Sequence, residues 1–157
     1  DIGVTGVQTC ALPILGLNLI RKFEGFYAKP YLCPAGIPTI GYGATYYPNG
    51  KRVTLQDAAI TEQQAEEMLV SMLKTYEQSV DSFTRDDINQ NQFDALVSFA
   101  YNLGAKNLQG STLLKKVNAN PNDLAIKLEF LKWNKAAGKV LSGLTKRRQE
   151  EADLYFS

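Results

Sequence analysis

The chain has 157 residues, of which 45% are hydrophobic and 21% charged, and its formal net charge at pH 7 is +1. This near-neutral balance argues against a dedicated nucleic-acid-binding protein, and no apolar run approaches the roughly 18 residues that would anchor it in a membrane. The chain has no histidine and only two cysteines, which excludes a zinc site of the usual type and a serine–histidine–aspartate apparatus, so acid chemistry must rest on carboxylates.

The beginning of the chain matches the translation of a laboratory DNA sequence. Residues 4–14 read as the in-frame product of a common sequencing-library adapter. We therefore expect residues 1–14 to be a non-native, adapter-derived segment and residues 15–157 to form the native domain. The alternative is a short apolar leader, but the segment lacks the basic region and long apolar core of a signal peptide. Cys33 is then the only native cysteine, which excludes an intramolecular disulfide.

The first expected elements are a helix and a small sheet. Apolar residues recur at helical spacing over 17–26, which predicts an amphipathic helix that carries Glu24 on its edge and is stopped by Pro30. Residues 39–43 and 45–47 are rich in β-branched and aromatic side chains, as strands are. The Asn-Gly pair at 49–50 then predicts a hairpin turn into residues 51–54.

Helices are expected from residue 61 onward. Thr61 and Gln64 form a capping-box pair, which predicts the start of a long helix joining two lobes. A second helix is expected over residues 91–103, and Gly104 suits its left-handed end.

Two more helices are expected near the C-terminus. The Asn-Pro pair at residues 120–121 predicts a helix start, with Leu124, Leu128 and Leu131 on its buried side. A last helix should cover residues 146–155. A helix, a small sheet and then many helices describe an α+β protein with segregated parts, in which a cleft between a sheet lobe and a helical lobe is expected.

Three side chains between residues 23 and 43 can carry chemistry. Glu24 ends a helix before a turn rich in glycine and proline, and Cys33 and Thr39 follow in that turn and strand, so an acid, a thiol and a hydroxyl can be aimed at one point. The run resembles the active-site signature of the phage-type lysozymes, muramidases of the endolysin class, in which a Glu is followed nine positions later by Asp or Cys and six further by Thr. Residues 101–104, 110–114 and 143–151 also resemble that family.

The resemblance implies a fold and an activity. The fold would be lysozyme-like α+β, with a small antiparallel sheet lobe, a larger helical lobe and an active-site cleft between them. The enzyme would act as a monomer on bacterial peptidoglycan, cleaving the β-1,4 bond between N-acetylmuramic acid and N-acetylglucosamine without metal or cofactor. It would accumulate in the host bacterial cytoplasm and reach the wall in the periplasm only when the inner membrane is opened. A non-catalytic wall-binding module and a chitin-type glycosidase are the alternatives.

Each signature residue has an expected role and a structural alternative. Cleavage of a glycosidic bond needs a carboxylic acid that is still protonated at working pH, and Glu24 is the candidate; otherwise it pairs with Arg21 or Lys29 on a helix edge. Cys33 and Thr39 would position water; otherwise Cys33 is a small buried hydrophobe and Thr39 a strand residue.

The chain departs from the family at two positions. The family more often has Asp where Cys33 stands, and a thiol that is mostly protonated is a poorer base. The resemblance implies an inverting reaction, but the missing second carboxylate leaves the stereochemistry open. Asp57 is a conceivable substitute, although it lies outside the signature. Ala44 stands where the family commonly has His.

Further polar residues are candidates for contacts with sugar hydroxyl and acetamido groups. They are Tyr42, Gln92, Asn102, Ser111 and Thr112, and each can equally be a helix cap or a packed residue at the core edge. Positive charge also gathers near the C-terminus, at Lys135, Lys139, Lys146, Arg147 and Arg148. A solvated helix face with local pairing to Glu150 and Glu151 is favoured there over a site for an anionic wall polymer.

Overall fold

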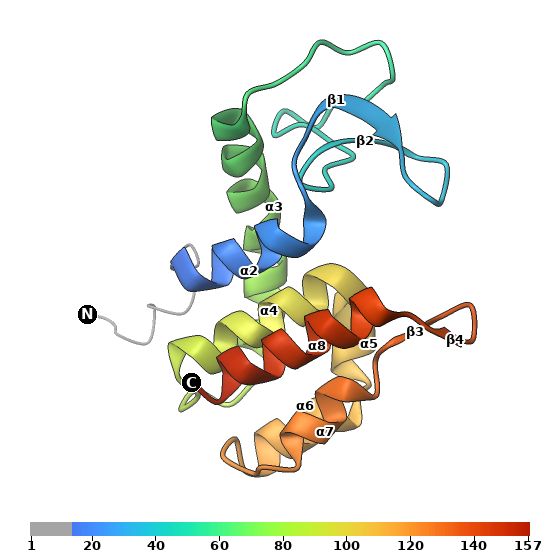
Figure 1. Ribbon diagram of the computed structural model, residues 1–157. Coiled ribbons are helices and arrows are strands. Elements are labelled where there is room, and N and C mark those ends of the chain that lie inside the picture. The colour runs from blue at the N-terminus through green and yellow to red at the C-terminus, as the bar shows by residue number, and fades with distance from the viewer. Residues whose placement is uncertain (1–13) are drawn as a thin grey trace. The chain divides into compact units, whose positions relative to one another are not determined.

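The computed structural model describes residues 14–157 (Figure 1). The expected adapter segment therefore lies outside the described residues, except for Ile14, which begins the first helix. The helices are α2 (Ile14–Glu24), α3 (Glu62–Phe83), α4 (Gln90–Leu103), α5 (Ala105–Gln109), α6 (Thr112–Ala119), α7 (Ile126–Leu131) and α8 (Ser142–Tyr155). The strands are β1 (Tyr27–Leu32), β2 (Pro38–Gly41), β3 (Lys135–Ala136) and β4 (Lys139–Val140), in two antiparallel pairs.

The chain forms two compact units. Unit 2 runs from Ile20 to Lys74 and holds the β1–β2 sheet, whereas unit 1 holds, among the described residues, 14–19 and Thr75 to Ser157. Both α2 and α3 continue from one unit into the other. The prediction of an α+β chain whose long helix joins two parts is therefore confirmed. None of the helices in residues 14–157 is both long enough and apolar enough to cross a membrane.

Helix α2 ends earlier than the sequence predicted. It stops at Glu24, because Gly25 adopts a positive φ of 74° and its N–H donates to the Arg21 carbonyl at 3.0 Å. The expectation that Pro30 stops this helix is wrong, since Pro30 lies inside β1. A proline is tolerated there because a two-stranded sheet leaves one edge of each strand without a ladder partner.

The sheet of unit 2 begins directly after that turn. Tyr27 pairs with Gly41, Tyr31 with Thr39 and Leu32 with Pro38. The predicted strand at residues 39–43 is thus present but ends at Gly41.

The predicted Asn-Gly turn is also present, with a single bridge between Tyr46 and Arg52 in place of full strands. Ile40, Ala44, Val53 and Met68 form the buried cluster of this unit, so Ala44 packs in a core.

The long helix starts where its capping box predicted. The Thr61 N–H donates to Gln64 Oε1 at 2.8 Å, and the Gln64 N–H donates to Thr61 Oγ1 at 3.1 Å. Helix α4 also agrees with the prediction, and its residues from Gln92 to Ala100 are buried throughout. Gly104 follows it with a φ of 95°, and its N–H donates to the Ala100 carbonyl.

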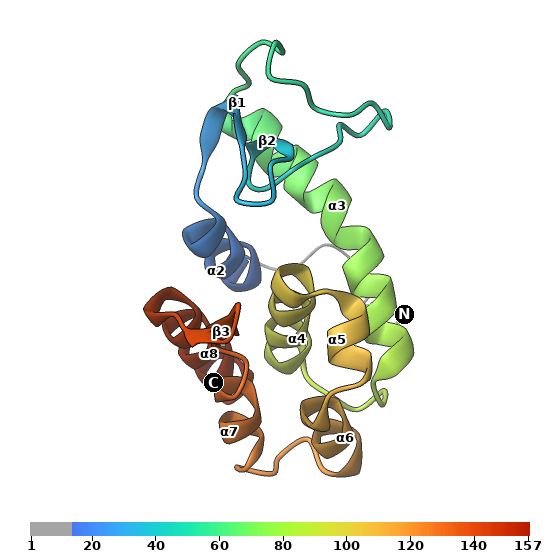
Figure 2. The ribbon, with the colours of Figure 1, turned by 90° about the vertical axis from the view of Figure 1, so that its right-hand side faces the viewer.

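The helix near residue 120 differs from the prediction. Asn120 is the C-cap of α6, and α7 begins only at Ile126. The expected buried side is wrong as well, because Leu124 is 77% exposed and Leu128 is 62% exposed. Ile126 and Phe130, at a helical spacing of four, are buried instead, and Figure 2 shows α7 beside α8.

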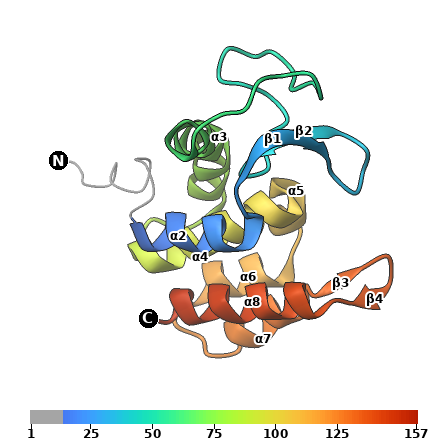
Figure 3. The same ribbon diagram turned by 45° about the horizontal axis from the view of Figure 1, so that its top comes forward.

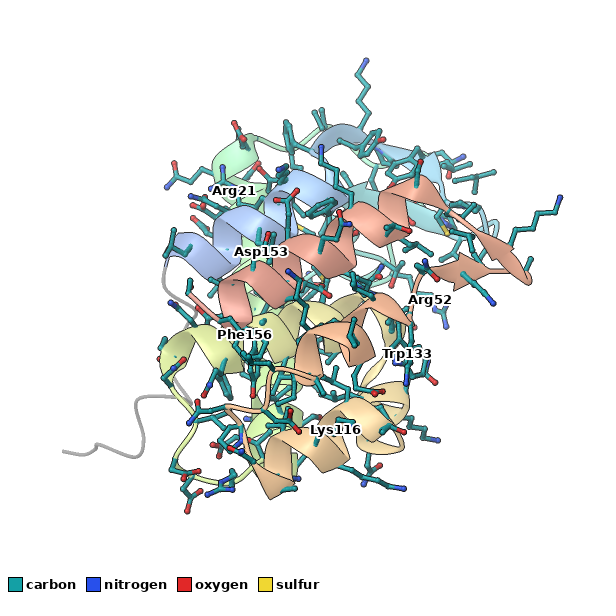
Figure 4. The ribbon with its side chains drawn as sticks, turned by 60° about the horizontal axis from the view of Figure 1, so that its bottom comes forward. Arg21, Arg52, Lys116, Trp133, Asp153 and Phe156 are labelled. Carbon is teal, nitrogen blue, oxygen red and sulfur yellow. The ribbon has the colours of Figure 1, made fainter. Side chains whose placement is uncertain are left out.

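Three elements have no counterpart in the sequence prediction, namely α5, α6 and the β3–β4 hairpin. The hairpin turns through Ala137 and Gly138, both with positive φ, and runs into α8 (Figure 3). Helix α8 begins at Ser142, four residues before the expected position. Edge-to-face aromatic contacts pack the core of unit 1, with Phe99 against both Phe130 and Trp133, and Trp133 follows α7 in Figure 4.

Candidate functional site

Glu24, Cys33 and Thr39 all lie in unit 2: Glu24 ends α2, Cys33 follows β1 in the turn to β2, and Thr39 lies in β2. Tyr31 links them, because it pairs with Thr39 across the sheet and precedes Cys33 by two residues. Burial raises the pKa of Tyr31, and the charges of Tyr27, Glu24 and Cys33 raise it further. The carboxyl and the thiol are therefore both within electrostatic range of one phenol ring.

A tight turn fixes the positions of the thiol and the hydroxyl. The Cys33 N–H donates to the Ile37 carbonyl at 3.1 Å, and the Gly36 N–H donates to the Cys33 carbonyl at 2.7 Å. Gly36 has a φ of 76°, which glycine adopts without steric cost. Thr39 is 3% exposed, and its hydroxyl donates to the Ile37 carbonyl at 2.8 Å.

The same turn favours the thiolate form of Cys33. A hydrogen bond from the Ile37 backbone lowers the pKa of the thiol below its ordinary value, partial burial opposes this, and the Ala35 backbone and the Thr39 side chain lower it further. A thiolate accepts hydrogen bonds more strongly than a thiol. The turn and the strand that follows it therefore supply a thiol with increased thiolate character and a hydroxyl, in the unit that also carries the carboxyl of Glu24.

Tyr42 belongs to a polar cluster at the start of α3. Its hydroxyl donates to Glu62 Oε2 at 2.9 Å and accepts from Arg21 Nε at 3.3 Å. Arg21, labelled on α2 in Figure 4, also pairs with Glu66 at 2.8 Å. Burial is the main cause that raises the pKa of Tyr42. Since Tyr42 is 3% exposed, its contacts fit the packed alternative, and a contact with sugar stays a prediction.

The other predicted substrate contacts lie in unit 1. Gln92 completes the capping box of α4, and the Ser111 hydroxyl caps α6 by accepting from the Leu114 N–H at 3.0 Å. Asn102 Oδ1 accepts from Arg148 at 2.9 Å, and Thr112 is exposed in the first turn of α6. Gln92 and Ser111 thus have the cap role that was the alternative, and for all four residues a contact with sugar stays a prediction.

Asp57, the conceivable second carboxylate, closes a local turn. It accepts from the Thr54 N–H at 2.9 Å, the Thr54 hydroxyl at 2.7 Å and the Tyr47 hydroxyl at 2.7 Å. These hydrogen bonds, led by the Thr54 backbone, lower the pKa of Asp57, while burial and Asp57 raise the pKa of Tyr47 to about 12. Asp57 therefore acts as a structural acceptor in this turn.

The basic residues near the C-terminus are not one solvated face. Arg147 is 3% exposed and Arg148 is fully buried, as is their partner Glu151. Glu151 lies 3.3 Å from Arg147 and 2.6 Å from Arg148, and it accepts from the Ser98 hydroxyl at 2.6 Å. Burial raises the pKa of Glu151, although both arginines oppose the shift. The expected pairing is present, but the expected solvation is wrong for both arginines.

Sequence reasoning missed this buried network. The sequence does contain a signal for it, because Arg147 precedes Glu151 by four residues and Arg148 precedes it by three on one helix. That spacing permits ion pairs both on a surface and in a core, so it could not show that the network is buried. Lys135, Lys139 and Lys146 are exposed, as expected. Within residues 14–157, no group of three or more cysteine, aspartate or glutamate side chains is arranged to hold a metal ion.

Comparisons with known proteins agree on one family. The family model for phage lysozyme matches residues 21–151. The endolysin of Bacillus phage B103 is 42% identical over 142 residues, covering 90% of this chain and 52% of that protein, so the chain spans about half the length of this relative. The endolysin of Salmonella phage P22 is 37% identical and covers 90% of this chain and 95% of its own.

A solved structure extends the likeness to the fold. The structure of an endolysin from Escherichia coli O157:H7 phage FAHEc1 superimposes with a TM-score of 0.85 at 38% identity, and the match covers 93% of each chain.

Proposed function

The chain belongs to the phage lysozyme family and has its α+β fold, and from this premise we propose that it is a muramidase of the endolysin type. It hydrolyses the β-1,4 bond between N-acetylmuramic acid and N-acetylglucosamine in bacterial peptidoglycan. The observation that carries the proposal is that Glu24, Cys33 and Thr39 all lie in unit 2, where one turn joins Cys33 to the strand of Thr39 and Tyr31 pairs with Thr39. These residues lie within the part of the chain that the family model matches.

The proposed roles follow from the chemistry of glycoside hydrolysis. Glu24 donates a proton to the glycosidic oxygen while positive charge grows on the sugar ring, and proton transfer of this kind is worth roughly a hundredfold to ten-thousandfold in rate. Cys33, as thiolate, and Thr39 hold the attacking water on the opposite face of the ring. Attack by water from that face gives inversion at the anomeric carbon, the outcome that the family resemblance implies.

Release of soluble fragments from purified Gram-negative sacculi, followed by mass spectrometry, tests the proposal. The wild-type chain should release disaccharide peptides with reducing muramic-acid ends, and Glu24→Gln should lower that rate by about a hundredfold or more. Glu67→Gln, on an exposed position of α3, is the matched control and should keep full activity. No release by the folded wild-type chain would overturn the muramidase assignment.

A wall-binding module is the second candidate, and Cys33 at the position of the family's more usual carboxylate is the observation that favours it. Such a module would sediment with sacculi and release nothing. A chitin-type glycosidase would instead release oligosaccharides from chitin at a rate comparable with its rate on sacculi, which the same mass spectrometric assay measures.

We also propose a route and a state for the enzyme. It accumulates as a monomer in the host cytoplasm, binds neither nucleic acid nor cofactor, and reaches the wall when the inner membrane is opened. Membership of the family supports this route. Sedimentation should then give a mass near 17.4 kDa, and expression should lyse cells only after the inner membrane is permeabilised.

The predicted sugar contacts remain part of the proposal. Of the five, Thr112 is the exposed one, so its hydroxyl is free to approach a bound strand. Tyr42, Gln92, Asn102 and Ser111 would contribute through groups that also bind within the chain. Replacement of Thr112 by Val, which keeps the shape and removes the hydroxyl, should raise KM on sacculi without changing kcat.

A further inference from the structure

Two tyrosine rings lie against each other on β1, the strand that leads to Cys33. The ring centroids of Tyr27 and Tyr31 are 4.3 Å apart, and the ring planes are inclined by 35°. Tyr31 is half-buried, whereas Tyr27 is 48% exposed. Tyr31, the inner ring, therefore packs against Tyr27, the outer ring, while about half of the Tyr27 side chain faces solvent.

Glycines leave the outer ring uncovered. Tyr27 pairs across the sheet with Gly41, which has no side chain to lie against the ring. On its other flank, the position that a Cβ of Gly25 would occupy is 3.6 Å from Tyr27 Cε2. The ring thus rests near the backbone of the α2–β1 connection, and neither neighbour covers it.

The stacked pair is continuous with the proposed catalytic site. Tyr31 is the residue whose surroundings include both Glu24 and Cys33, and it lies directly opposite Thr39 in the strand register. An object that rests on the Tyr27–Tyr31 pair therefore lies on the strand that leads into the β1–β2 turn, opposite Thr39 and within electrostatic range of Glu24.

We propose that Tyr27, held in place by Tyr31, is a stacking platform for one N-acetylhexosamine ring of the glycan strand, next to the bond that is cleaved. The inference rests on the proposed function for the identity of the strand. A pyranose ring presents C–H groups on its faces, and these meet the electron-rich face of an aromatic ring favourably. A preordered aromatic side chain also loses little conformational entropy when a ligand binds.

Binding measurements test the platform separately from catalysis. The full chain carrying Glu24→Gln would be titrated with a peptide-free strand of alternating N-acetylglucosamine and N-acetylmuramic acid, by calorimetry and by proton NMR. Adding Tyr27→Leu, which keeps an apolar side chain against Tyr31, should weaken binding by about threefold to tenfold, the range expected for one aromatic contact. Adding Tyr27→Phe, which keeps the ring, should weaken it by less than about twofold.

Tyr46→Leu is the matched control. Tyr46 is also a tyrosine of unit 2 and is 44% exposed, but its ring lies against Arg52, which Figure 4 labels. This change should leave the affinity for the strand unaltered.

Stacking should also move sugar C–H resonances upfield on binding. Tyr27→Leu should abolish that shift while the melting temperature stays near that of the parent.

The outcomes separate the two proposals. If the wild-type chain cleaves sacculi but Tyr27→Leu binds the strand as tightly as its parent, the platform is wrong and the muramidase assignment stands. If the wild-type chain cleaves nothing, the muramidase assignment fails, and the affinities still decide on the platform. An equal loss with Tyr27→Leu and Tyr46→Leu would indicate a general effect of surface tyrosines and would also overturn the platform.

Discussion

Cys33 stands where the proposed reaction needs a base. Hydrogen bonds from the Ile37 backbone and from the Ala35 backbone lower the pKa of its thiol, so the protein stabilises the form that can accept a proton. An aspartate in the same turn would be ionised from a much lower pH, since its ordinary pKa is about 3.9. The difference between a thiol and a carboxyl thus becomes a difference in the pH range of activity.

The pH profile tests this interpretation of Cys33. The wild-type kcat/KM should rise with pH as the thiol ionises, because the thiolate is the active form and exists above the pKa. Cys33→Asp should move that rise to about pH 4, and Cys33→Ala should lower the rate at every pH. Initial rates of turbidity loss of sacculi measure all three. An identical acid limb in the wild type and in Cys33→Asp would contradict a role for the thiol as base.

Asp94 is a buried carboxyl without a charged partner in the described part of the chain. It is fully buried in α4, its Oδ1 accepts from Gln90 at 2.8 Å, and its Oδ2 has no hydrogen-bond partner. Gly16 of α2 lies against it, since a Cβ there would come within 2.8 Å of Oδ2. Burial raises the pKa of Asp94 to about 6, although Gln90 opposes the shift.

Asp94 should make the folded state less stable as pH rises. Its pKa is higher in the folded than in the unfolded chain, so its favourable contribution is complete below about pH 4 and is lost by about pH 6, a change of order 2 kcal/mol. The difference in melting temperature between Asp94→Asn and the wild type should therefore grow in favour of the mutant between these pH values. Asp153→Asn, on the exposed side of α8 (Figure 4), should show no such trend.

At the scale of single elements, local signals predicted helix starts well and buried faces less well. The side chains of Thr61 and Gln64 are sufficient to predict where α3 starts, because they form a local capping box. The structure has both of its hydrogen bonds. The Asn-Pro pair at residues 120–121 gives an equally clear local signal, yet there the chain makes turns and α7 starts five residues later. Which face of α7 is buried depends on contacts with α8, which no local pattern contains.

The cap of α3 has a measurable effect on stability. Thr61→Ala removes the acceptor for the Gln64 N–H and should lower the free energy of unfolding by about 1 kcal/mol. Thr75→Ala makes the same change at an exposed position within α3 and should leave stability unchanged or slightly higher, because alanine favours helix. Urea unfolding monitored by circular dichroism compares the two. Equal losses would show that the cap contributes nothing.

The orientation of α7 can be tested with two substitutions. Leu128→Ala should change the free energy of unfolding by no more than about 0.5 kcal/mol, because the side chain is mostly exposed. Phe130→Ala removes a fully buried ring that contacts Phe99 and Tyr155 and should cost about 3–5 kcal/mol. A larger loss of stability with Leu128→Ala than with Phe130→Ala would instead support the buried face that the sequence predicted.

At the scale of the whole molecule, the sequence predicted the fold class and the signature residues, but not the contacts between residues far apart in the chain. The three signature residues could be identified from the sequence because they lie in one short motif. In the structure a single tight turn then joins Cys33 to the strand that carries Thr39. The buried charges of Arg147, Arg148 and Glu151 could not be predicted, because their partner Ser98 is 53 residues from Glu151 along the chain. Pairings of this range depend on how α4 packs against α8.

The adapter origin of residues 1–14 remains our proposal. We predict that a chain without residues 1–13 releases muropeptides at the wild-type rate and melts at the wild-type temperature, because an unselected segment has no reason to contribute to either. Both assays use the intact chain as reference. A loss of activity or a lowered melting temperature would argue that the segment is native, as would an authentic upstream coding region in the source DNA.

Unit 2 is an insertion within unit 1, because unit 1 contains both the beginning of α2 and everything from Thr75 onward. Chains fold from the N-terminus as the ribosome releases them, so residues 20–74 can become compact early. The first turns of α2 pack against α4 where Gly16 meets Asp94, and Ser98 of α4 hydrogen-bonds Glu151 of α8. The helix that ends at Glu24 therefore starts in unit 1 and depends there on contacts with residues synthesised more than 70 positions later.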